Sequence, residues 1–345
     1  MNERVLISVC IPVFDSELYL ERCLQSAYKQ NFDSFEILVV SDASVGRDEK
    51  NKSAKKIVKQ AQKDCKLYRK KAGLTPIKIH FFEHSENRGL IEARRTLVYE
   101  AHGIYITQLD SDDELADDAL KSLFEASQYD IQNEHSGLDI IHGTSISGSF
   151  NTDGIFVSSK ENRYGKIVYE KITGRDIFHR WLIGQELTSN TWGKLIKKEI
   201  FLQAYDSIPY TQCNMAEDVL LFFFISQYAK SYVGIKNEVY HYRINIGMTS
   251  TRKIDTLQKW KMICSTASVF TIISEWIKEN ENALLPEEIE KLRFMARSYL
   301  ANNLKQMREV VIPELQPAAR ELLCDYWGSD FVETMEQAIK ENSNN

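Results

Sequence analysis

The stretch YITQLDSDDEL, residues 105–115, places four carboxylic acids directly behind an apolar run. Side chains alternate along a strand, so Asp110 and Asp112 at its end can point toward the same spot. Two carboxylates that close raise each other's pKa unless a cation lies between them. Oxygen ligands suit Mg²⁺ or Mn²⁺, and such an ion usually completes its shell with substrate phosphates. The stretch therefore indicates either a metal–diphosphate site or a solvated acidic loop in which Asp113 or a nearby acid caps the next helix.

The elements that must position these acids alternate in type over about the first 130 residues. Apolar runs rich in β-branched residues predict buried strands at 5–12, 35–41, 76–84 and 103–110. Helical spacing of apolar residues predicts helices after Ser16, over 48–71, from Leu90 and over 116–129. This alternation is typical of a mostly parallel sheet with helices on both faces, an α/β fold.

Polar side chains fall just past the predicted strand ends. They are Asp15, Asp42, Asn87 and Asp110. Ligands of open α/β sheets bind at the carboxyl ends of the strands. We therefore expect these four residues to line one crevice.

After residue 138 the pattern changes. The sequence predicts strands near 138–146 and over 238–244, a hairpin or projecting loop from 154–159 and 166–172, and a buried helix over 217–229. Beyond Asp255 only helical patterns remain. We predict a body over 1–250, divided into halves of about 1–135 and 136–250, and a helical C-terminal region over 251–345.

The bulk composition fits a soluble cytoplasmic protein. Of 345 residues, 43% are hydrophobic and 27% charged, and no apolar run reaches the length of about 18 residues that spans a bilayer. The N-terminal segment contains Glu3 and has no small-residue cleavage site, which argues against a signal peptide. Six scattered cysteines predict reduced thiols rather than a disulfide frame or a zinc site.

The charge is unevenly distributed. Residues 47–71 carry eleven Lys and Arg against three acids, although the whole chain has a net charge of −6. One helix face, the lysine face, gathers Lys52, Lys55, Lys59, Lys63, Lys66 and Lys70. It is either a solvated surface or a face attracted to an anionic membrane, which would place the protein at the inner side of the cell membrane. Nucleic acid is not an expected partner, because the chain is acidic and has no recognition module.

Five segments in order resemble the motifs of family 2 glycosyltransferases, which have the nucleotide-sugar-binding GT-A fold. They are SVCIPVFDSELYLERCLQSAYKQ, EILVVSDAS, ENRGLIEARRTL, YITQLDSDDEL and AEDVLLFF. The resemblance covers roughly residues 5–250. It departs from the pattern at Asp15, Ser41, Ala43 and Arg95, and the changes at Ser41 and Ala43 leave the base of the donor nucleotide open.

The resemblance implies roles for individual residues. Asp42 would face the base, and Arg94 would lie near the nucleotide or its phosphates. Asp110 would contact the ribose or the metal, and Asp112 would be the main ligand of Mn²⁺ or Mg²⁺. Asp218 would be the catalytic base, with Glu217 beside it. The nucleotide-sugar site would be made by Pro12, Val13, Phe14, Asp15, Asp42, Asn87, Arg94, Asp110, Ser111 and Arg243.

Three further residues keep two interpretations each. Arg243 either contacts a pyrophosphate or forms a structural ion pair at a strand end. Trp192 either stacks on an acceptor sugar or packs in the core. His241 is either a third metal ligand or a structural histidine.

The resemblance implies inverting, metal-dependent transfer of a sugar from a nucleotide sugar to an acceptor hydroxyl. A UDP-sugar is the favoured donor, and a glycan, lipid-linked or protein-linked acceptor is expected, in the setting of bacterial surface polysaccharide assembly. Two alternatives remain. One is a Mg²⁺-dependent phosphotransferase, whose Asp-x-Asp motif usually lies near the N-terminus. The other is a non-catalytic carbohydrate- or partner-binding protein, against which Asp112 and Asp218 argue.

Overall fold

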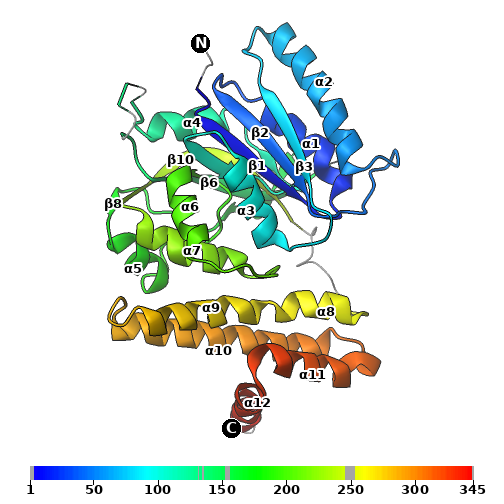
Figure 1. The fold of residues 1–345 in the computed structure, drawn as a ribbon, viewed down its shortest axis with the longest axis vertical. Helices are drawn as coiled ribbons and strands as arrows, with labels where there is room; N and C mark the ends of the chain where they lie inside the picture. The colour runs from blue at the N-terminus through cyan, green and yellow to red at the C-terminus, as the bar shows by residue number, and fades with distance from the viewer. Residues whose placement is uncertain (1–3, 131, 134–135, 152–155, 245–252, 344–345) are drawn as a thin grey trace.

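The structure is a computed structural model that describes residues 4–343 except 131, 134–135, 152–155 and 245–252. A ten-stranded sheet forms the centre of an α/β body, and a layer of helices lies below it (Figure 1). The N-terminal half contains β1 (Ile7–Val13), α1 (Glu17–Tyr28), β2 (Phe35–Ser41), α2 (Ala54–Ala72), β3 (Lys78–Glu83), α3 (Leu90–Glu100), β4 (Tyr105–Gln108), β5 (Glu114–Leu115) and α4 (Ala119–Ala126). The second half contains β6 (Ile140–Phe150), β7 (Phe156–Tyr164), β8 (Ile172–Thr173), α5 (Asp176–Leu182), β9 (Lys194–Lys197), α6 (Lys198–Asp206), α7 (Glu217–Tyr228) and β10 (Ser231–Arg243).

The predicted fold class is confirmed: a central sheet is flanked by helices on both faces. The four predicted N-terminal strands form in the order β3-β2-β1-β4, all parallel. Beyond β4 the sheet is mixed, because β9 lies antiparallel between β4 and β6. β10 then runs parallel to β6 and antiparallel to β5.

Of the hairpin or projecting loop predicted from 154–159 and 166–172, the hairpin is not formed by the described residues. Its residues 154 and 155 lie outside the described part of the chain. β7 pairs with β6 instead, and Phe150 of β6 contacts Phe156 of β7 with ring centroids 5.3 Å apart. Of the second segment, only Ile172 enters a strand, β8, at the edge of β10.

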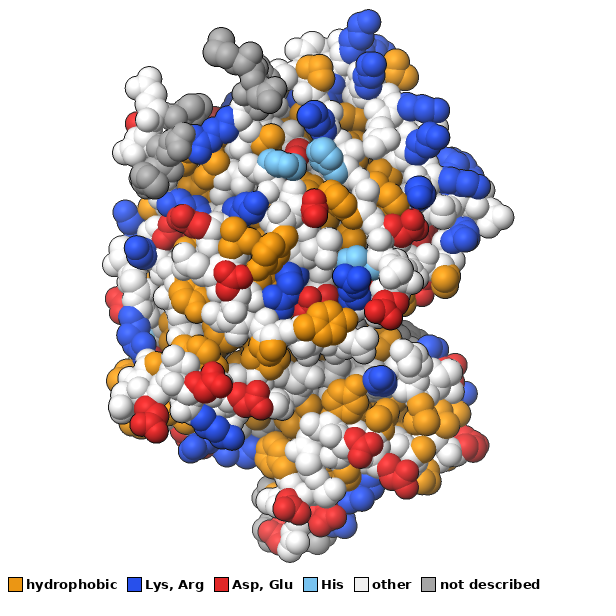
Figure 2. Space-filling model, in the orientation of Figure 1, with side chains coloured by type: hydrophobic (Ala, Val, Ile, Leu, Met, Phe, Trp, Pro, Cys, Tyr) orange, Lys and Arg blue, Asp and Glu red, His pale blue; other side chains and the backbone are white. Residues whose placement is uncertain are grey.

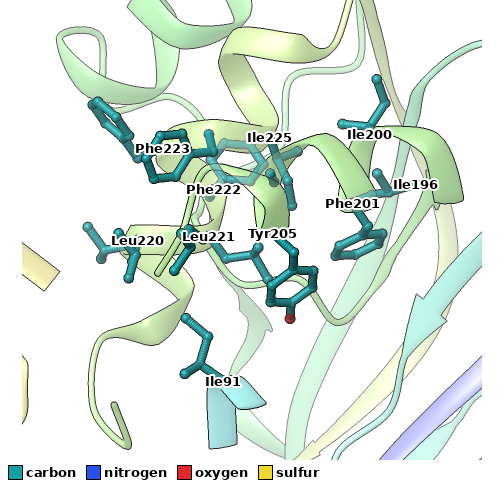
Figure 3. Close-up of a cluster of buried hydrophobic side chains, with 14 of the residues drawn as sticks. Ile91, Ile196, Ile200, Phe201, Tyr205, Leu220, Leu221, Phe222, Phe223 and Ile225 are labelled. Atoms are coloured by element: carbon teal, nitrogen blue, oxygen red, sulfur yellow. The ribbon is translucent and has the colours of Figure 1, made fainter. Parts of the chain in front are cut away.

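Alternation along β1 divides the core between the two faces of the sheet. Val9 and Ile11 pack with α1, α2 and α4, whereas Cys10 packs with α3, α6 and α7. Figure 3 shows the second core, in which α7 inserts its apolar side chains between Ile91 of α3 and Phe201 of α6. The apolar run at the start of α7 is therefore buried on all sides, as its sequence predicts. The six cysteines are free, and five of them are buried.

The C-terminal region is helical from Leu257 onward. It contains α8 (Leu257–Cys264), α9 (Thr266–Glu279), α10 (Pro286–Glu309), a short 3-10 turn (Pro313–Leu315), α11 (Gln316–Trp327) and α12 (Ser329–Ser343). α8 and α10 to α12 share a core of their own around Trp260, while Trp276 of α9 contacts Phe223 of α7 at 5.3 Å. The predicted domain boundary at residues 250–251 lies outside the described residues.

A buried acid also attaches the helical layer to the body. Glu288, at the first turn of α10, is 0% exposed and bonds with the guanidinium of Arg175 next to α5. Arg175 also donates to the carbonyl of Ala283 at 3.0 Å. In the part of the chain that the structure describes, no helix is both long and apolar enough to cross a membrane.

Candidate active site

One cavity of about 1900 Å³ opens at the carboxyl ends of the parallel strands. All four polar residues expected past the strand ends line it, namely Asp15, Asp42, Asn87 and Asp110. Its walls also contain Pro12, Val13, Phe14, Arg94, Ser111, Asp112, Trp192, Glu217, Asp218 and Arg243. Every residue for which the resemblance implies a role therefore lies on this cavity.

The loop after β1 is attached to the loop after β2. Asp15 has a positive φ of 51°, and its carboxylate accepts a hydrogen bond from the Gly46 amide at 3.0 Å. Its own amide donates to the Ser44 hydroxyl at 2.8 Å. Phe14 beside it is 39% exposed, so an aromatic face is available at the cavity edge.

Asp42 follows β2 and is only 2% exposed. One of its carboxylate oxygens contacts His84 Nδ1 at 2.6 Å and accepts the Arg88 amide at 2.9 Å. The other accepts the Gly89 amide at 2.9 Å. Asp42 thus fixes the turn that leads into α3, and the role at a nucleotide base implied for it stays a prediction.

Arg94 of α3 connects three acids. Its guanidinium donates to Asp110 at 2.8 Å, to Glu217 at 2.9 Å and to Asp218 at 3.0 Å. Arg94 is 1% exposed, so it is better placed to hold these carboxylates than to meet a phosphate. Burial lowers the pKa of Arg94, but the three acids around it outweigh that effect and raise it well above its usual value. The cation therefore stays charged and keeps the acids together.

Glu217 and Asp218 begin α7, at the positive end of that helix. Burial raises the pKa of both, and the charge of Asp218 raises that of Glu217 further. Arg94 binds Oδ1 of Asp218, while Oδ2 accepts no hydrogen bond from the described residues. The Asp218 side chain is 25% exposed, so this oxygen is available to a ligand in the cavity.

The acids of the stretch 105–115 have two kinds of role: some face the cavity, and others stabilise the surrounding fold. Asp113 is buried and accepts from the Tyr240 hydroxyl at 2.8 Å and from the Arg243 amide at 2.7 Å. Glu114 receives Arg22 at 2.8 Å. These two acids shape the loop, and the position before α4 is held by Asp118 rather than by Asp113.

Asp112 has no such partner among the described residues. Burial, followed by the charge of Asp110, raises the pKa of Asp112 to about 6. No group of three potential metal-ligating side chains occurs among the residues that the structure describes. Two carboxylates with substrate phosphates are the ligand set that Mg²⁺ typically accepts, so the pair of Asp110 and Asp112 fits such an ion.

The remaining candidates differ in their surroundings. Trp192 is 5% exposed and stacks on Tyr240 and Tyr242, with ring centroids 4.7 and 5.3 Å apart. Arg243 lies over the rings of Tyr19 and Phe150. Its guanidinium is 3.7 Å from the Glu114 carboxylate, so it forms the structural ion pair that was one of its two interpretations. His241 stacks on Phe156 and bonds with Glu238, outside the described lining of the main cavity.

Two supporting residues had no clear signal in the sequence. The Tyr240 hydroxyl accepts the Asp110 amide at 3.2 Å while donating to Asp113, so it sets the backbone of the acidic loop. Lys194 is 0% exposed and donates to the carbonyls of Thr188 and Asn190, which line the cavity. Burial lowers the pKa of Lys194 to about 7. For Tyr240 the one available signal is its spacing from Tyr242 in YHYRI, which places both rings on the same face of a strand. Lys194 has no comparable signal.

Comparison with known proteins identifies the N-terminal part. Residues 8–131 match glycosyl transferase family 2. Glycosyltransferase GlyA of Streptococcus pneumoniae is 27% identical over 71% of this chain, which spans 31% of GlyA. Glycosyltransferase GlyG of the same organism is 23% identical over 84% of this chain and 85% of its own length.

Among solved structures, Staphylococcus aureus TarS 1–349 in complex with UDP-GlcNAc aligns with 98% of this chain and 92% of its own. The identity is 17% and the TM-score 0.49, too low to add to the assignment. The motifs and the sequence match agree without it. The N-terminal part of the chain, residues 8–131, therefore matches glycosyl transferase family 2, in agreement with the resemblance seen in its motifs.

Proposed function

We propose that this chain is an inverting glycosyltransferase that moves a sugar from a nucleotide sugar, with a UDP-sugar favoured, to an acceptor hydroxyl. One observation carries the proposal: residues from five separate segments of the family pattern meet on a single cavity. The family match over residues 8–131 supports the reaction class. The names of GlyA and GlyG, both glycosyltransferases, point the same way.

The acids would have distinct tasks in this reaction. The acceptor oxygen attacks the anomeric carbon, the bond to the nucleoside diphosphate breaks, and Oδ2 of Asp218 takes the hydroxyl proton. Arg94 fixes the other oxygen of Asp218 and so orients the base. Asp110 and Asp112 would hold Mn²⁺ or Mg²⁺, which neutralises charge on the departing diphosphate.

A thermal-shift panel tests the proposal. The full chain is heated with each common nucleotide and nucleotide sugar, with and without Mn²⁺. We expect one nucleotide to raise the melting temperature in a metal-dependent way. Asp112→Ala should remove this shift, whereas Glu114→Ala should have a milder effect because Glu114 pairs with Arg22. Absence of a response to every nucleotide would contradict the proposal.

Turnover separates an enzyme from a binding protein on the same scaffold. Slow hydrolysis of the stabilising nucleotide sugar, measured as released nucleotide, is expected of the wild-type chain without an acceptor. A chain that binds the nucleotide sugar but never hydrolyses or transfers it would be a binding protein.

A further inference from the structure

The cavity is larger than one donor needs. Its volume of about 1900 Å³ compares with roughly 300–1,000 Å³ for pockets that enclose one small ligand. The additional space lies against the C-terminal helices, because residues of α8 and α10 line the cavity together with the carboxylates of the body. The outline of the molecule is indented where the body meets these helices (Figure 2). The site therefore has room for a second ligand.

The two walls of this cavity differ in charge. The body contributes seven carboxylic acids: Asp15, Asp42, Asp110, Asp112, Asp113, Glu217 and Asp218. None of the described lining residues after Arg243 is acidic, and Lys259 and Lys291 are among them. A ligand on the helical wall thus meets neutral polar, apolar and cationic groups, and needs no metal to offset negative charge.

α10 presents one long face to the cavity. Lining residues recur along it from Lys291 to Val310, a length of about 28 Å at the rise of an α-helix. Its opposite face is buried through Leu300 and Leu304. The lining face is therefore elongated, and a ligand that fills it must be a chain rather than a single compact group.

The middle of this face lies near the proposed base. Tyr299 lines the cavity together with Glu217 and Asp218, and it packs against the core that contains the apolar residues of α7. Tyr299 also contacts the ring of Phe270, with centroids 5.3 Å apart. A chain that passes Tyr299 would carry its hydroxyls past Asp218.

The side chains on the α10 face indicate which chemical class of elongated ligand it can bind. Phe294 is 54% exposed, and two amide side chains, Asn302 and Gln306, line the cavity on the same helix. A purely aliphatic chain would cover these amides and leave them without partners, at a cost of about 1–3 kcal/mol each. A sugar chain uses both kinds of group, since its ring faces stack on aromatic side chains and its hydroxyls bond with amides.

We propose that the α10 face is the acceptor site and that the acceptor is an extended oligosaccharide, bound through Phe294, Asn302 and Gln306. This inference rests on the proposed transferase function and names its acceptor class. Lys291 lies toward one end of the trough. Lys259 lies toward the other, because Ile254 before α8 pairs with Val311 after α10. A substituent with negative charge, phosphate or carboxylate, suits the Lys291 end, because Lys259 already pairs with Asp255 at 2.8 Å.

A glycan array tests this acceptor class. The labelled full-length chain is applied to an array of bacterial and mammalian oligosaccharides graded by length, in neutral, carboxylated and phosphorylated forms. We expect binding of glycans longer than a disaccharide, with a preference for anionic forms. The triple variant Phe294→Ala, Asn302→Ala, Gln306→Ala should weaken binding at least about tenfold, which corresponds to about 1.4 kcal/mol.

Lys305→Ala is the matched control, because this exposed residue lies on α10 outside the cavity lining. It should bind glycans as the wild type does. Farnesyl diphosphate serves as the lipid probe in the same assay. Binding of farnesyl diphosphate alone, no bound glycan, or equal glycan binding by the triple variant and the control would each overturn the inference.

The nucleotide thermal shift, measured on the same variants, keeps the two proposals apart. A retained nucleotide response with unchanged glycan binding in the triple variant refutes only the acceptor site. If the melting temperature of the wild type responds to no nucleotide at all, the transferase function itself is refuted.

Discussion

Arg94 touches three carboxylates at once, and its burial decides what those acids can do. The Arg94 guanidinium binds Oδ1 of Asp218 at 3.0 Å and so fixes the orientation of this carboxylate, while Oδ2 remains available to a ligand. Glu217 is 7% exposed and faces the same guanidinium. The two acids are neighbours in sequence, and the Asp218 side chain is the more accessible of the two, 25% exposed against 9% for Glu217.

Asp218→Asn should abolish sugar transfer while nucleotide binding survives. The amide has nearly the shape of the carboxylate but cannot accept the acceptor proton, so we expect kcat to fall by about 10²–10⁴. Transfer assays and the nucleotide thermal shift are measured side by side. Equal loss of transfer and of nucleotide binding would show that Asp218 is needed for the site's structure instead.

The raised pKa of Asp112 predicts an acid limit for metal binding. Below pH 6 this carboxyl becomes protonated, and metal ligation needs the ionised form. We expect the apparent affinity for Mn²⁺, titrated with the stabilising nucleotide, to fall about tenfold between pH 7 and pH 5. An affinity that does not change over this range would contradict the predicted ligand.

The same shift has the opposite sign for the stability of the metal-free protein. Because the pKa of Asp112 is higher in the folded than in the unfolded chain, its stabilising contribution is present at low pH and disappears as pH rises through 6. Asp112→Asn should therefore be more stable than the wild type at pH 7.5, by at most about 3 kcal/mol. Urea unfolding at pH 5 and pH 7.5, with EDTA, measures whether this advantage shrinks in acid.

At the scale of the elements, α2 has the amphipathic form that its sequence predicts. On the side opposite the lysine face, Ala54, Val58, Ala61 and Cys65 are buried, although Tyr68, the next residue on that side, is 38% exposed. Blue side chains gather over α2 in the space-filling view (Figure 2). Within the described chain, Lys55 forms the one ion pair of the lysine face, with Glu83 at 3.5 Å.

If the lysine face contacts an anionic membrane, flotation with vesicles will show it. Each lysine near such a surface contributes about 1 kcal/mol, so the full chain should float with phosphatidylserine vesicles at low salt. It should not float with neutral vesicles or in 0.5 M salt, about the point where screening removes surface charge effects. Changing Lys55, Lys59, Lys63 and Lys66 to Gln should abolish flotation, and failure of the wild type to float at low salt would leave only a solvated face.

The elements also show how far the sequence determines the fold. Parallel strands buried on both faces are continuous apolar runs, and β1, β2 and β4 were predictable for that reason. β9 has only four residues, and its place between β4 and β6 depends on partners far away in the sequence. The crevice could be predicted because strand ends share one edge. The bonds of Tyr240 and Lys194 could not, because they depend on how distant loops pack.

At the scale of the whole molecule, a half-exposed arginine holds the helical layer to the body. Arg175→Ala would take the guanidinium away from Glu288, which is 0% exposed and would keep His179 Nδ1 at 3.6 Å as a weaker partner. We expect a loss of about 1–3 kcal/mol in the free energy of unfolding and faster hydrogen exchange at the start of α10. Arg180→Ala is the control, since Arg180 of α5 pairs with Glu170 and Glu186 within the body and should cost less than about 1 kcal/mol. Equal effects of the two variants would contradict the role given to Glu288.

The two walls of the cavity have a consequence for how such a protein can change over time. All lining acids precede Arg243 in the chain, and the α10 face follows Leu257. A single recombination event between these positions would replace one wall entire and leave the other intact. A lineage could thus inherit its donor chemistry unchanged while acquiring a new acceptor, and chimeras joined at this point are the natural units for engineering altered glycans.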